Sequence, residues 1–254
     1  MNVRIGSDPE TFLIDQTGKF ISSVGLIGGS KDEPMSIGEG CTVQEDNVTV
    51  EFNTPPTNDE DSFVKSINYN LEWITKRANQ LGLTVMHTPS AVFDDEQLDS
   101  EGAKTFGCDP DFNAWNFSNP NPRPLAKNAN LRSAGGHIHI EAPELDKEEL
   151  IKAMDLFVGV PMLEFDKDAN RRKLYGKAGA YRPKTYGVEY RTASNAWLQD
   201  DDKKRWVFKQ TQKAVEFVKA GKQIPEDMGI VIQKAINKSN ITLAKTIMNW
   251  SATL

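Results

Sequence analysis

The order of apolar and polar residues along the chain predicts several short strands and a few amphipathic helices. Apolar runs and period-two alternation predict strands over residues 3–5, 11–15, 19–23, 42–44, 47–53, 83–93, 134–141 and 186–192. Apolar positions near helical spacing predict helices over residues 58–82, 146–165 and most of the chain after 200, with a break at 221–225. Residues 94–130 and 171–185 follow neither period, so we expect loops there. Strands joined by hairpins or single helices indicate an α+β fold with a mostly antiparallel sheet and helices on one face.

Four strand-like stretches place polar side chains two residues apart. They are Asp8-Pro9-Glu10, Glu51-Phe52-Asn53, His137-Ile138-His139 and Glu189-Tyr190-Arg191. Residues i and i+2 of a strand point to the same face, so each pair presents two polar groups on one side of a sheet. Together they supply four carboxylates, two imidazoles and one guanidinium. We interpret them as one sheet face that holds metal ions and a charged ligand.

Two of these pairs also have a plainer interpretation. Asp8 and Glu10 repel unless a cation or proton lies between them, but a solvent-facing pair explains them equally well. Pro9 predicts that their strand is an edge strand or carries a bulge. Glu189 and Arg191 are either a simple ion pair or a metal ligand beside an oxyanion clamp.

The two histidines are easier to interpret as functional. His137 and His139 follow Gly135-Gly136, which allow close approach of a ligand, and an HxH pair on a strand suits a metal or a phosphate. The third histidine, His87, has no partner nearby in sequence, so we predict a structural role for it.

Composition and charge restrict the class of protein. The chain has 254 residues, 38% of them apolar and 26% charged, which indicates a globular protein. Its net charge of −6 argues against non-specific nucleic-acid binding. Two cysteines are too few for a disulfide framework, and neither a signal-peptide core nor a membrane-spanning run is present. We therefore expect a soluble cytoplasmic protein without nucleic-acid or membrane partners.

The expected second loop carries a basic cluster. Its members are Arg171, Arg172, Lys173, Lys177, Arg182 and Lys184. A local basic patch in an acidic protein suggests an anionic ligand such as nucleotide phosphates, although a solvated loop explains it as well. In the first loop we assign Cys108 a structural role and consider Trp115 a candidate substrate or adenine contact.

Taken in order, these motifs resemble the glutamine synthetase and glutamate–cysteine ligase superfamily. The motifs are Gly6-Ser7-Asp8-Pro9-Glu10-Thr11-Phe12, Gly135-Gly136-His137-Ile138-His139, and Glu189-Tyr190-Arg191 followed by Asn195. Three more are similar to the carboxylate–amine ligases of tailed phages, the type-2 COOH-NH2 ligase group: Glu51-Phe52-Asn53-Thr54-Pro55-Pro56, Gly107-Cys108-Asp109-Pro110-Asp111 and Tyr175-Gly176-x-x-Gly179-x-Tyr181-Arg182. The resemblance spans roughly residues 5–198.

The resemblance implies a fold, a reaction and roles for individual residues. The fold would be a curved, mostly antiparallel sheet with helices on its convex face, in one catalytic domain over residues 1–254: a motif-bearing sheet core at 1–198 and a helical part at 199–254. The reaction would join a small-molecule or peptide carboxylate to an amine, with ATP and Mg²⁺ or Mn²⁺ as cofactors and an acyl phosphate as intermediate. The implied metal ligands are Asp8, Glu10, Glu51, His137 and Glu189. Residues with catalytic roles would be Arg191, Arg182 and Glu51, and cofactor contacts would come from Arg171, Arg172, Lys184, His139 and Asn53.

The sequence differs from the family pattern at two positions, and several other functions are compatible with the motifs. Asp8 replaces the Glu of many relatives, and Gly187 replaces an Arg of glutamine synthetases. A metal-dependent hydrolase or a cupin-like oxygenase would also use an HxH pair, the latter with Glu144 as a further ligand. A phage protein that binds a nucleotide or sugar without catalysis is the non-enzymatic alternative. If phage-encoded, the protein would act in the host cytoplasm, and the superfamily includes both monomers and rings, so an oligomer is compatible with the sequence.

Overall fold

The computed structural model describes residues 3–100, 103, 111–121 and 128–254. Its main strands are β1 (Arg4–Ile14), β3 (Met35–Gly38), β4 (Cys41–Asp46), β5 (Thr49–Asn53), β11 (Gly136–Glu141), β12 (Ala180–Lys184) and β13 (Gly187–Tyr190). Shorter strands are β2 (Phe20–Ile21), β6 (Thr84–Met86), β7 (Ser90–Val92), β8 (Phe112–Asn113), β9 (Asn119–Pro120) and β10 (Leu131–Ser133). The helices are α1 (Glu60–Gln80), η1 (Asp95–Leu98), α3 (Lys147–Met154), η2 (Asp155–Gly159), α4 (Val160–Met162), α5 (Arg171–Leu174), η3 (Asn195–Gln199), α6 (Asp201–Lys219), α7 (Glu226–Asn237) and α8 (Ile241–Ser251).

A long antiparallel sheet is the centre of the fold. Its strands follow the order β3-β4-β5-β1-β11-β13-β12-β8-β9, with β2 and β6 pairing with the far end of β1. The separate pair β7–β10 is also antiparallel. Every strand pairing described in the structure is antiparallel, so the predicted α+β class with a mostly antiparallel sheet is confirmed.

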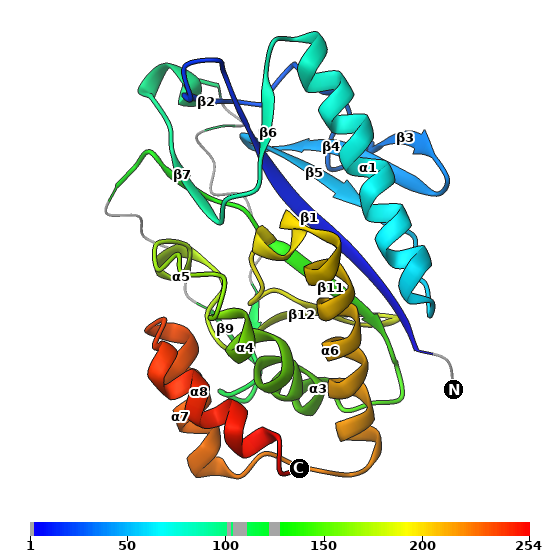
Figure 1. Cartoon of the computed structure of the whole chain (residues 1–254), viewed down its shortest axis with the longest axis vertical. Helices are drawn as coiled ribbons and strands as arrows, with labels where there is room; N and C mark the ends of the chain where they lie inside the picture. Colours follow the sequence, from blue (N-terminus) through cyan, green and yellow to red (C-terminus); the bar gives the residue numbers. More distant parts are fainter. Residues whose placement is uncertain (1–2, 101–102, 104–110, 122–127) are drawn as a thin grey trace.

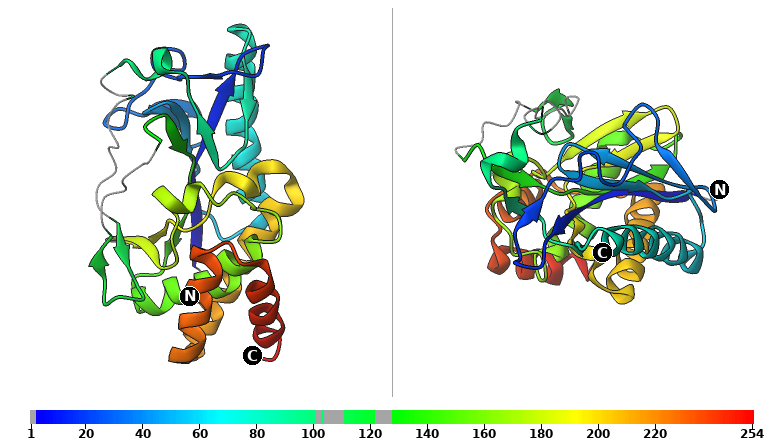
Figure 2. Two further views of the ribbon diagram at one scale, coloured as in Figure 1. Left: turned by 90° about the vertical axis from the view of Figure 1, so that its left-hand side faces the viewer. Right: turned by 90° about the horizontal axis from the view of Figure 1, so that it is seen from above.

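Helices cover one face of this sheet. Figures 1 and 2 show α1 and α6 side by side on the same side of β1, and α3 packs against α6 and β13. Ile138, Ile140, Val188 and Tyr190 alternate with the polar pairs and are fully buried beneath these helices. The polar pairs therefore lie on the opposite face from the main core.

Local signals located several helices correctly. Asp59 and Asp146 are the N-caps of α1 and α3, where their side chains accept from Ser62 N and Glu149 N. The break at 221–225 separates α6 from α7 as expected. No helix in the described part of the chain is long and apolar enough to span a membrane.

Several expectations about strands are wrong. The runs predicted at 3–5 and 11–15 merge into one continuous strand, β1, which spans Arg4–Ile14 and has Pro9 inside it, neither at an edge nor at a bulge. Glu10 N donates to Gly135 O, directly before β11, so the Pro9 nitrogen faces the other side, where β5 pairs only from Glu10 onward. The run 83–93 forms two strands in different sheets, and a third of the expected loop 171–185 is the strand β12.

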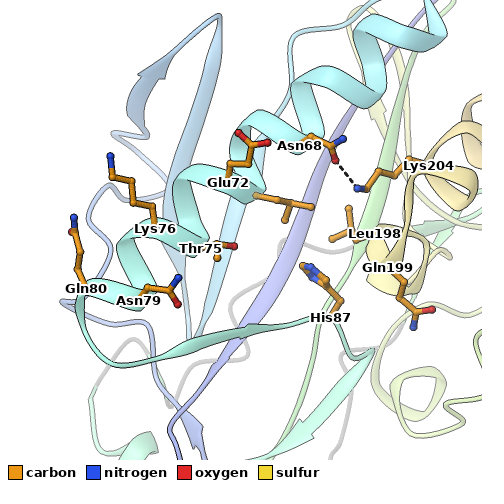
Figure 3. A pocket seen from close by; sticks show the side chains of 11 residues that line it. Asn68, Glu72, Thr75, Lys76, Asn79, Gln80, His87, Leu198, Gln199 and Lys204 are labelled. Carbon is orange, nitrogen blue, oxygen red and sulfur yellow. Dashed lines mark hydrogen bonds between the residues drawn. The ribbon is translucent and has the colours of Figure 1, made fainter.

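An open groove of about 810 Å³ lies where α1 meets η3 and the start of α6 (Figure 3). His87 lies at this groove, and Lys204 Nζ donates to Asn68 Oδ1 at 2.6 Å. Burial, followed by the charge of Lys204, lowers the pKa of His87 to about 4. His87 is thus a neutral, largely buried side chain remote from the four polar pairs, in agreement with the structural role predicted for it.

Candidate functional site

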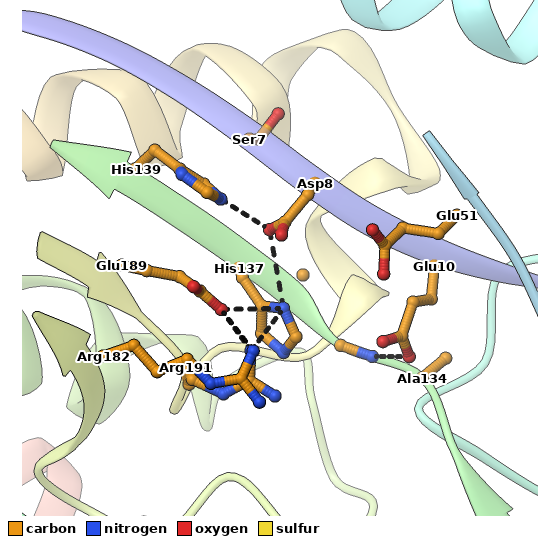
Figure 4. A network of polar contacts seen from close by, with 12 residues as sticks. Ser7, Asp8, Glu10, Glu51, Ala134, His137, His139, Arg182, Glu189 and Arg191 are labelled. Atoms are coloured by element: carbon orange, nitrogen blue, oxygen red, sulfur yellow. Dashed lines mark hydrogen bonds and ion pairs between the residues drawn. The ribbon is translucent and has the colours of Figure 1, made fainter. Parts of the chain in front are cut away.

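Strand register brings the four polar pairs together on one face. The cross-strand partners are Glu51 and Glu10, Asp8 and His137, His139 and Glu189, and Glu189 and Arg182. Directly opposed residues have Cβ atoms about 5 Å apart, so this register makes the pairs into one continuous cluster. Figure 4 shows these side chains projecting from β1, β5, β11, β12 and β13 toward each other.

The first group of potential metal ligands consists of Asp8, His137 and Glu189. One ligand atom from each residue lies within 4.8 Å of the others. His137 Nδ1 is 3.5 Å from Asp8 Oδ1 and 3.8 Å from Glu189 Oε1. All three are largely buried, and His139 Nε2 approaches the same Asp8 oxygen at 2.9 Å.

The second group consists of Glu10, Glu51 and Asp46, again with ligand atoms within 4.8 Å of one another. Glu10 accepts a hydrogen bond from Gly135 N at 2.7 Å, and Glu51 accepts one from Gln44 Nε2 at 2.8 Å. Asp46 is not among the metal ligands predicted from the sequence. Gln44 and Asp46 are themselves two residues apart on a strand-like run, and this signal could have located both.

The two groups differ in their electrostatics. Burial, then the charge of Asp46, raises the pKa of Glu10 to about 7. Burial, then the charges of Asp8 and Glu10, raises the pKa of Glu51 well above its ordinary value. Burial also acts to raise the pKa of Asp8, but His139 and His137 outweigh it and hold that pKa well below its usual range. An added cation would relieve the carboxylate repulsion in the second group.

Arg191 and two neighbours supply positive charge beside the first group. Arg191 is buried, contacts Glu189, and its Nη1 lies 3.4 Å from His137 Nδ1. Lys184 Nζ is 2.8 Å from Glu189 Oε2, and Arg182 Nη1 is 3.7 Å from Glu189 Oε1. Burial and the Asp8 charge oppose ionisation of Glu189, but the cations led by Arg191 lower its pKa to about 2.

The other two arginines of the predicted phosphate set have structural partners. Arg171 is buried and donates to the carbonyl oxygens of Ala134, Thr192 and Arg191 at 2.8–3.1 Å. Arg172 donates to Asp166 Oδ2 at 2.9 Å and to Asp168 O at 2.8 Å. The Arg171 guanidinium therefore ties α5 to the backbone that flanks β11 and β13, and that of Arg172 fixes the loop before α5. These contacts are architectural and do not support the predicted phosphate role of either residue, which stays a prediction.

A cavity of about 360 Å³ continues the polar face along β1 and β11. Its lining residues are Arg4, Gly6, Ser7, Asn53, Thr54, Pro56, His139, Glu141 and Tyr186. Tyr186 OH forms a hydrogen bond with His139 Nδ1, which connects the cavity wall to Asp8. Arg4 and Glu141 form a two-contact ion pair at 2.5 and 2.9 Å on the exposed side. Asn53 is thus at a cavity beside the site rather than in either acidic group.

Three other sequence expectations are resolved or fall outside the described residues. The ring of Trp115 packs against Gly229 of α7 and its Nε1 donates to the buried Asp155, which accounts for this side chain without a bound adenine. Glu144 is exposed and belongs to neither acidic group, which removes the extra ligand that a cupin-like site would need. Cys108 lies outside the described residues.

The fold and the site together define a class: an antiparallel sheet whose open face carries two acidic groups and an arginine. Residues 127–246 match the model of a family described as Phage phiEco32-like COOH.NH2 ligase-type 2. The resemblance found in the sequence is therefore confirmed over this region, which contains the HxH and ExR strands but not β1 or β5. No curated protein matches the chain.

Solved structures similar to this chain include two of GmaS. One is described as a GmaS/ADP complex (12% identity, TM-score 0.48, 99% of this chain and 69% of that chain). Another is GmaS without ligand (10% identity, TM-score 0.42, 100% and 68%). A third is described as a novel glutamine synthase homolog (12% identity, TM-score 0.40, 99% and 67%).

Proposed function

We propose that this protein is an ATP-dependent carboxylate–amine ligase that forms an amide bond through an acyl phosphate. The observation that carries the proposal is the single sheet face on which two acidic groups and Arg191 meet, in a chain whose residues 127–246 match a ligase family. A structural sheet face would not need the eight ionisable side chains of the two acidic groups, His139 and Arg191, half of them buried, so close together.

The donor chemistry fits hard divalent ions. Carboxylate oxygens with one imidazole suit Mg²⁺ or Mn²⁺. Burial and neighbouring carboxylates raise the pKa values of Glu10 and Glu51, and a bound cation would offset this repulsion. Asp8, His137 and Glu189 would hold one ion, and Glu10, Asp46 and Glu51 another. Bound ions would neutralise phosphate charge during phosphoryl transfer.

The reaction has two balanced steps. A carboxylate oxygen of the acid attacks the γ-phosphorus of ATP, and the bond to the β,γ-bridging oxygen breaks to release ADP. The amine nitrogen then attacks the acyl carbon, loses a proton, and displaces inorganic phosphate. Neither step needs a protein nucleophile, so the protein must mainly position the reactants and stabilise charge.

Positively charged side chains of this chain suit that task. Arg191 presents a planar fork at the centre of the face, where it can grip a phosphoryl group or a carboxylate with two hydrogen bonds. Arg182 and Lys184 lie on the neighbouring strand within 4 Å of Glu189, so they can reach the same anionic group. These three residues replace the phosphate set that included Arg171 and Arg172.

The cavity beside His139 is our candidate for the nucleoside part of ATP. Its volume of about 360 Å³ falls in the range of small-molecule sites, and it opens along the same strands that carry the first acidic group. Pro56 and Tyr186 offer flat apolar surfaces, while Asn53 and Glu141 offer polar contacts for a base or ribose. Phosphates extending from this cavity would lead toward Asp8 and Arg191.

The test is a screen for ADP formation over pairs of acids and amines, with Mg²⁺ and ATP. Hydroxylamine in place of the amine should trap the intermediate as a hydroxamate, and only when the acid and ATP are both present. If a broad screen yields neither ADP nor hydroxamate from folded protein that binds Mg-ATP, the ligase proposal is wrong. A nucleotide-binding protein without catalysis would then be the better explanation.

A further inference from the structure

Asp155 is a buried carboxylate that none of the site motifs contains. It begins the π-helical turn Asp155–Gly159 after α3, and its side chain is fully inaccessible to solvent. Burial raises its pKa to about 6, although several hydrogen-bond donors act in the opposite direction. A buried acid is costly to retain unless it makes contacts that an apolar residue cannot make.

Three of its hydrogen-bond donors come from three neighbouring strands or their flanks. Trp115 Nε1 and Gly179 N both donate to Asp155 Oδ2, at 2.7 and 2.6 Å. Tyr190 OH donates to Asp155 Oδ1 at 2.8 Å. Trp115 follows β8, Gly179 precedes β12, and Tyr190 lies in β13, and these strands are adjacent in the sheet. One carboxylate therefore fixes three strands at a single point.

The surroundings leave little freedom for this arrangement. A Cβ on Gly159 would lie 2.5 Å from Tyr190 OH and 3.3 Å from Asp155 Oδ1. A Cβ on Gly179 would lie 2.6 Å from Trp115 Cδ1, and Gly179 has a φ of +75°. The π turn and both glycines thus pack tightly around the carboxylate. π-Helical turns of this kind often occur at functional sites.

The strands held by Asp155 carry the positive half of the site. Tyr190 lies between Glu189 and Arg191, so its side chain anchors β13 from the helix side while theirs point to the site. Arg182 follows Gly179 by three residues and pairs with Glu189. A shift at the Tyr190 or Gly179 contact would therefore move Arg191 and Arg182 relative to β1.

We infer that Asp155 is a positioning residue that holds Arg182, Glu189 and Arg191 in register with the acidic groups of β1 and β5. Its effect on catalysis rests on the proposed ligase function, whereas its effect on the three strands does not. The carboxylate acts by accepting hydrogen bonds, so an acceptor of the same shape should replace it and an apolar side chain should not.

Asp155→Asn and Asp155→Leu separate these possibilities. Asn can direct its oxygen to the two N–H donors and its NH₂ to Tyr190, whose hydroxyl can rotate to accept. Leu has a similar volume but leaves the N–H groups of Trp115 and Gly179 without an acceptor. We expect Asp155→Asn to retain kcat within about threefold, and Asp155→Leu to lose roughly 10- to 100-fold, because a displacement on the order of 1 Å at a site can cost about 100-fold.

Two controls address folding. Thr211→Ala removes a buried hydroxyl contact to Val207 O on α6, away from the three strands, and should lower stability without lowering kcat. Should Asp155→Leu not fold, Tyr190→Phe removes one donor alone and should reduce kcat by about three- to tenfold in folded protein. Full activity of a folded Asp155→Leu variant, or an equal loss in Asp155→Asn and Asp155→Leu, would overturn the inference.

A second measurement does not depend on ligase activity. The Gly179 amide should exchange slowly with solvent in the wild type and in Asp155→Asn, and at least about tenfold faster in Asp155→Leu and Tyr190→Phe. If the wild type proves inactive with every acid but this exchange pattern appears, only the proposed function has failed. If Gly179 exchange is the same in all variants, the positioning role of Asp155 is wrong whatever the activity.

Discussion

Asp46 shows how one side chain outside the obvious motifs can complete a site. It ends β4, and the hairpin to β5 brings it to Glu10 and Glu51 within 4.8 Å. Its charge is the second cause, after burial, of the raised pKa of Glu10. Asp46 therefore adds repulsion to the metal-free protein and a ligand to the metal-bound one.

We expect Asp46→Asn to stabilise the metal-free protein and to weaken metal binding. The free energy of unfolding at pH 8 should rise by on the order of 1 kcal/mol, about the energy of one pKa unit. The stabilisation that Mg²⁺ and ATP confer should fall, which thermal unfolding with and without both ligands can measure. Glu72→Gln, an exposed acid on α1, is the control. An Asp46→Asn variant that behaves like this control would exclude Asp46 from the site.

Two buried arginines should respond differently to the same substitution. Arg191→Lys keeps the charge but loses the planar fork. The transition state should therefore lose about 2–4 kcal/mol of stabilisation, which lowers kcat, while the stability of the fold changes little. Arg171→Lys cannot reach three carbonyl oxygens at once, so the free energy of unfolding should fall by about 1–3 kcal/mol. Urea unfolding and initial rates on both variants test the assignment, and the reverse pattern would contradict it.

His87 predicts a pH dependence of stability. Its pKa is about 4 in the folded protein and about 6.5 in the unfolded chain, so the unfolded state binds the extra proton between these values. Stability from this residue is complete above pH 6.5 and decreases as the pH falls toward 4. The difference in unfolding free energy between the wild type and His87→Gln should drop by about 2 kcal/mol from pH 7.5 to 4.5. A difference that stays constant over this range would refute the buried, neutral assignment.

At the scale of elements, η3 connects the site strands to the helical layer. Asn195 Nδ2 donates to Glu10 O at 2.9 Å, and Trp197 Nε1 donates to Gly136 O at 3.1 Å. The Trp197 ring also stacks on Phe63 of α1. The backbones of β1 and β11 are therefore fixed from the helix side, while their acidic and imidazole side chains project to the other face.

This contact should make Gly136 intolerant of any side chain. A Cβ there would lie 2.2 Å from Ser194 O and 2.4 Å from Trp197 Nε1. Gly136→Ala should lower the free energy of unfolding by about 2–3 kcal/mol, a typical cost of overpacking. Gly6→Ala, whose Cβ would come no closer than 3.3 Å to Thr54 O, should cost less than half as much in the same urea titration. Equal losses of unfolding free energy in the two variants would show that β11 and η3 move apart to accommodate the added methyl group.

At the scale of the whole molecule, the acidic groups and the cavity should act together. The cavity and the first acidic group share β1 and β11, so nucleotide and metal would occupy adjoining positions on one sheet face. Phosphates would complete the coordination of the ions, and the ions would offset the charge of the phosphates. Binding of each should therefore strengthen binding of the other.

Thermal unfolding can test this linkage. Mg²⁺ alone or ATP alone should stabilise the protein little, whereas both at about 100 times their dissociation constants should add about 2–3 kcal/mol. Glu189→Ala should abolish the joint effect without unfolding the protein. Tight binding of Zn²⁺ that ATP does not alter would instead favour the metal-dependent hydrolase.

The identity of the site face could be read from the sequence because strand geometry is local. A period of two places Asp8 with Glu10 and His137 with His139 on one side of any strand that contains them. The helical spacing of Phe63, Ile67 and Ile74 and the cap at Asp146 are equally local, and α1 and α3 form as predicted. A run of about ten residues is enough to specify each of these features.

Strand order and the partners of buried charges depend instead on contacts between residues far apart in the sequence. Arg171 carries the same charge as Arg191, yet its guanidinium is directed at backbone carbonyls and that of Arg191 at Glu189. Asp46 joins Glu10 only because β4 and β5 pair next to β1. Pro9 is accepted inside β1 because its nitrogen faces away from β11. These arrangements depend on packing over the whole molecule, because each buried polar group needs a hydrogen-bond partner. That partner lies far away in the sequence, so the local sequence cannot predict it.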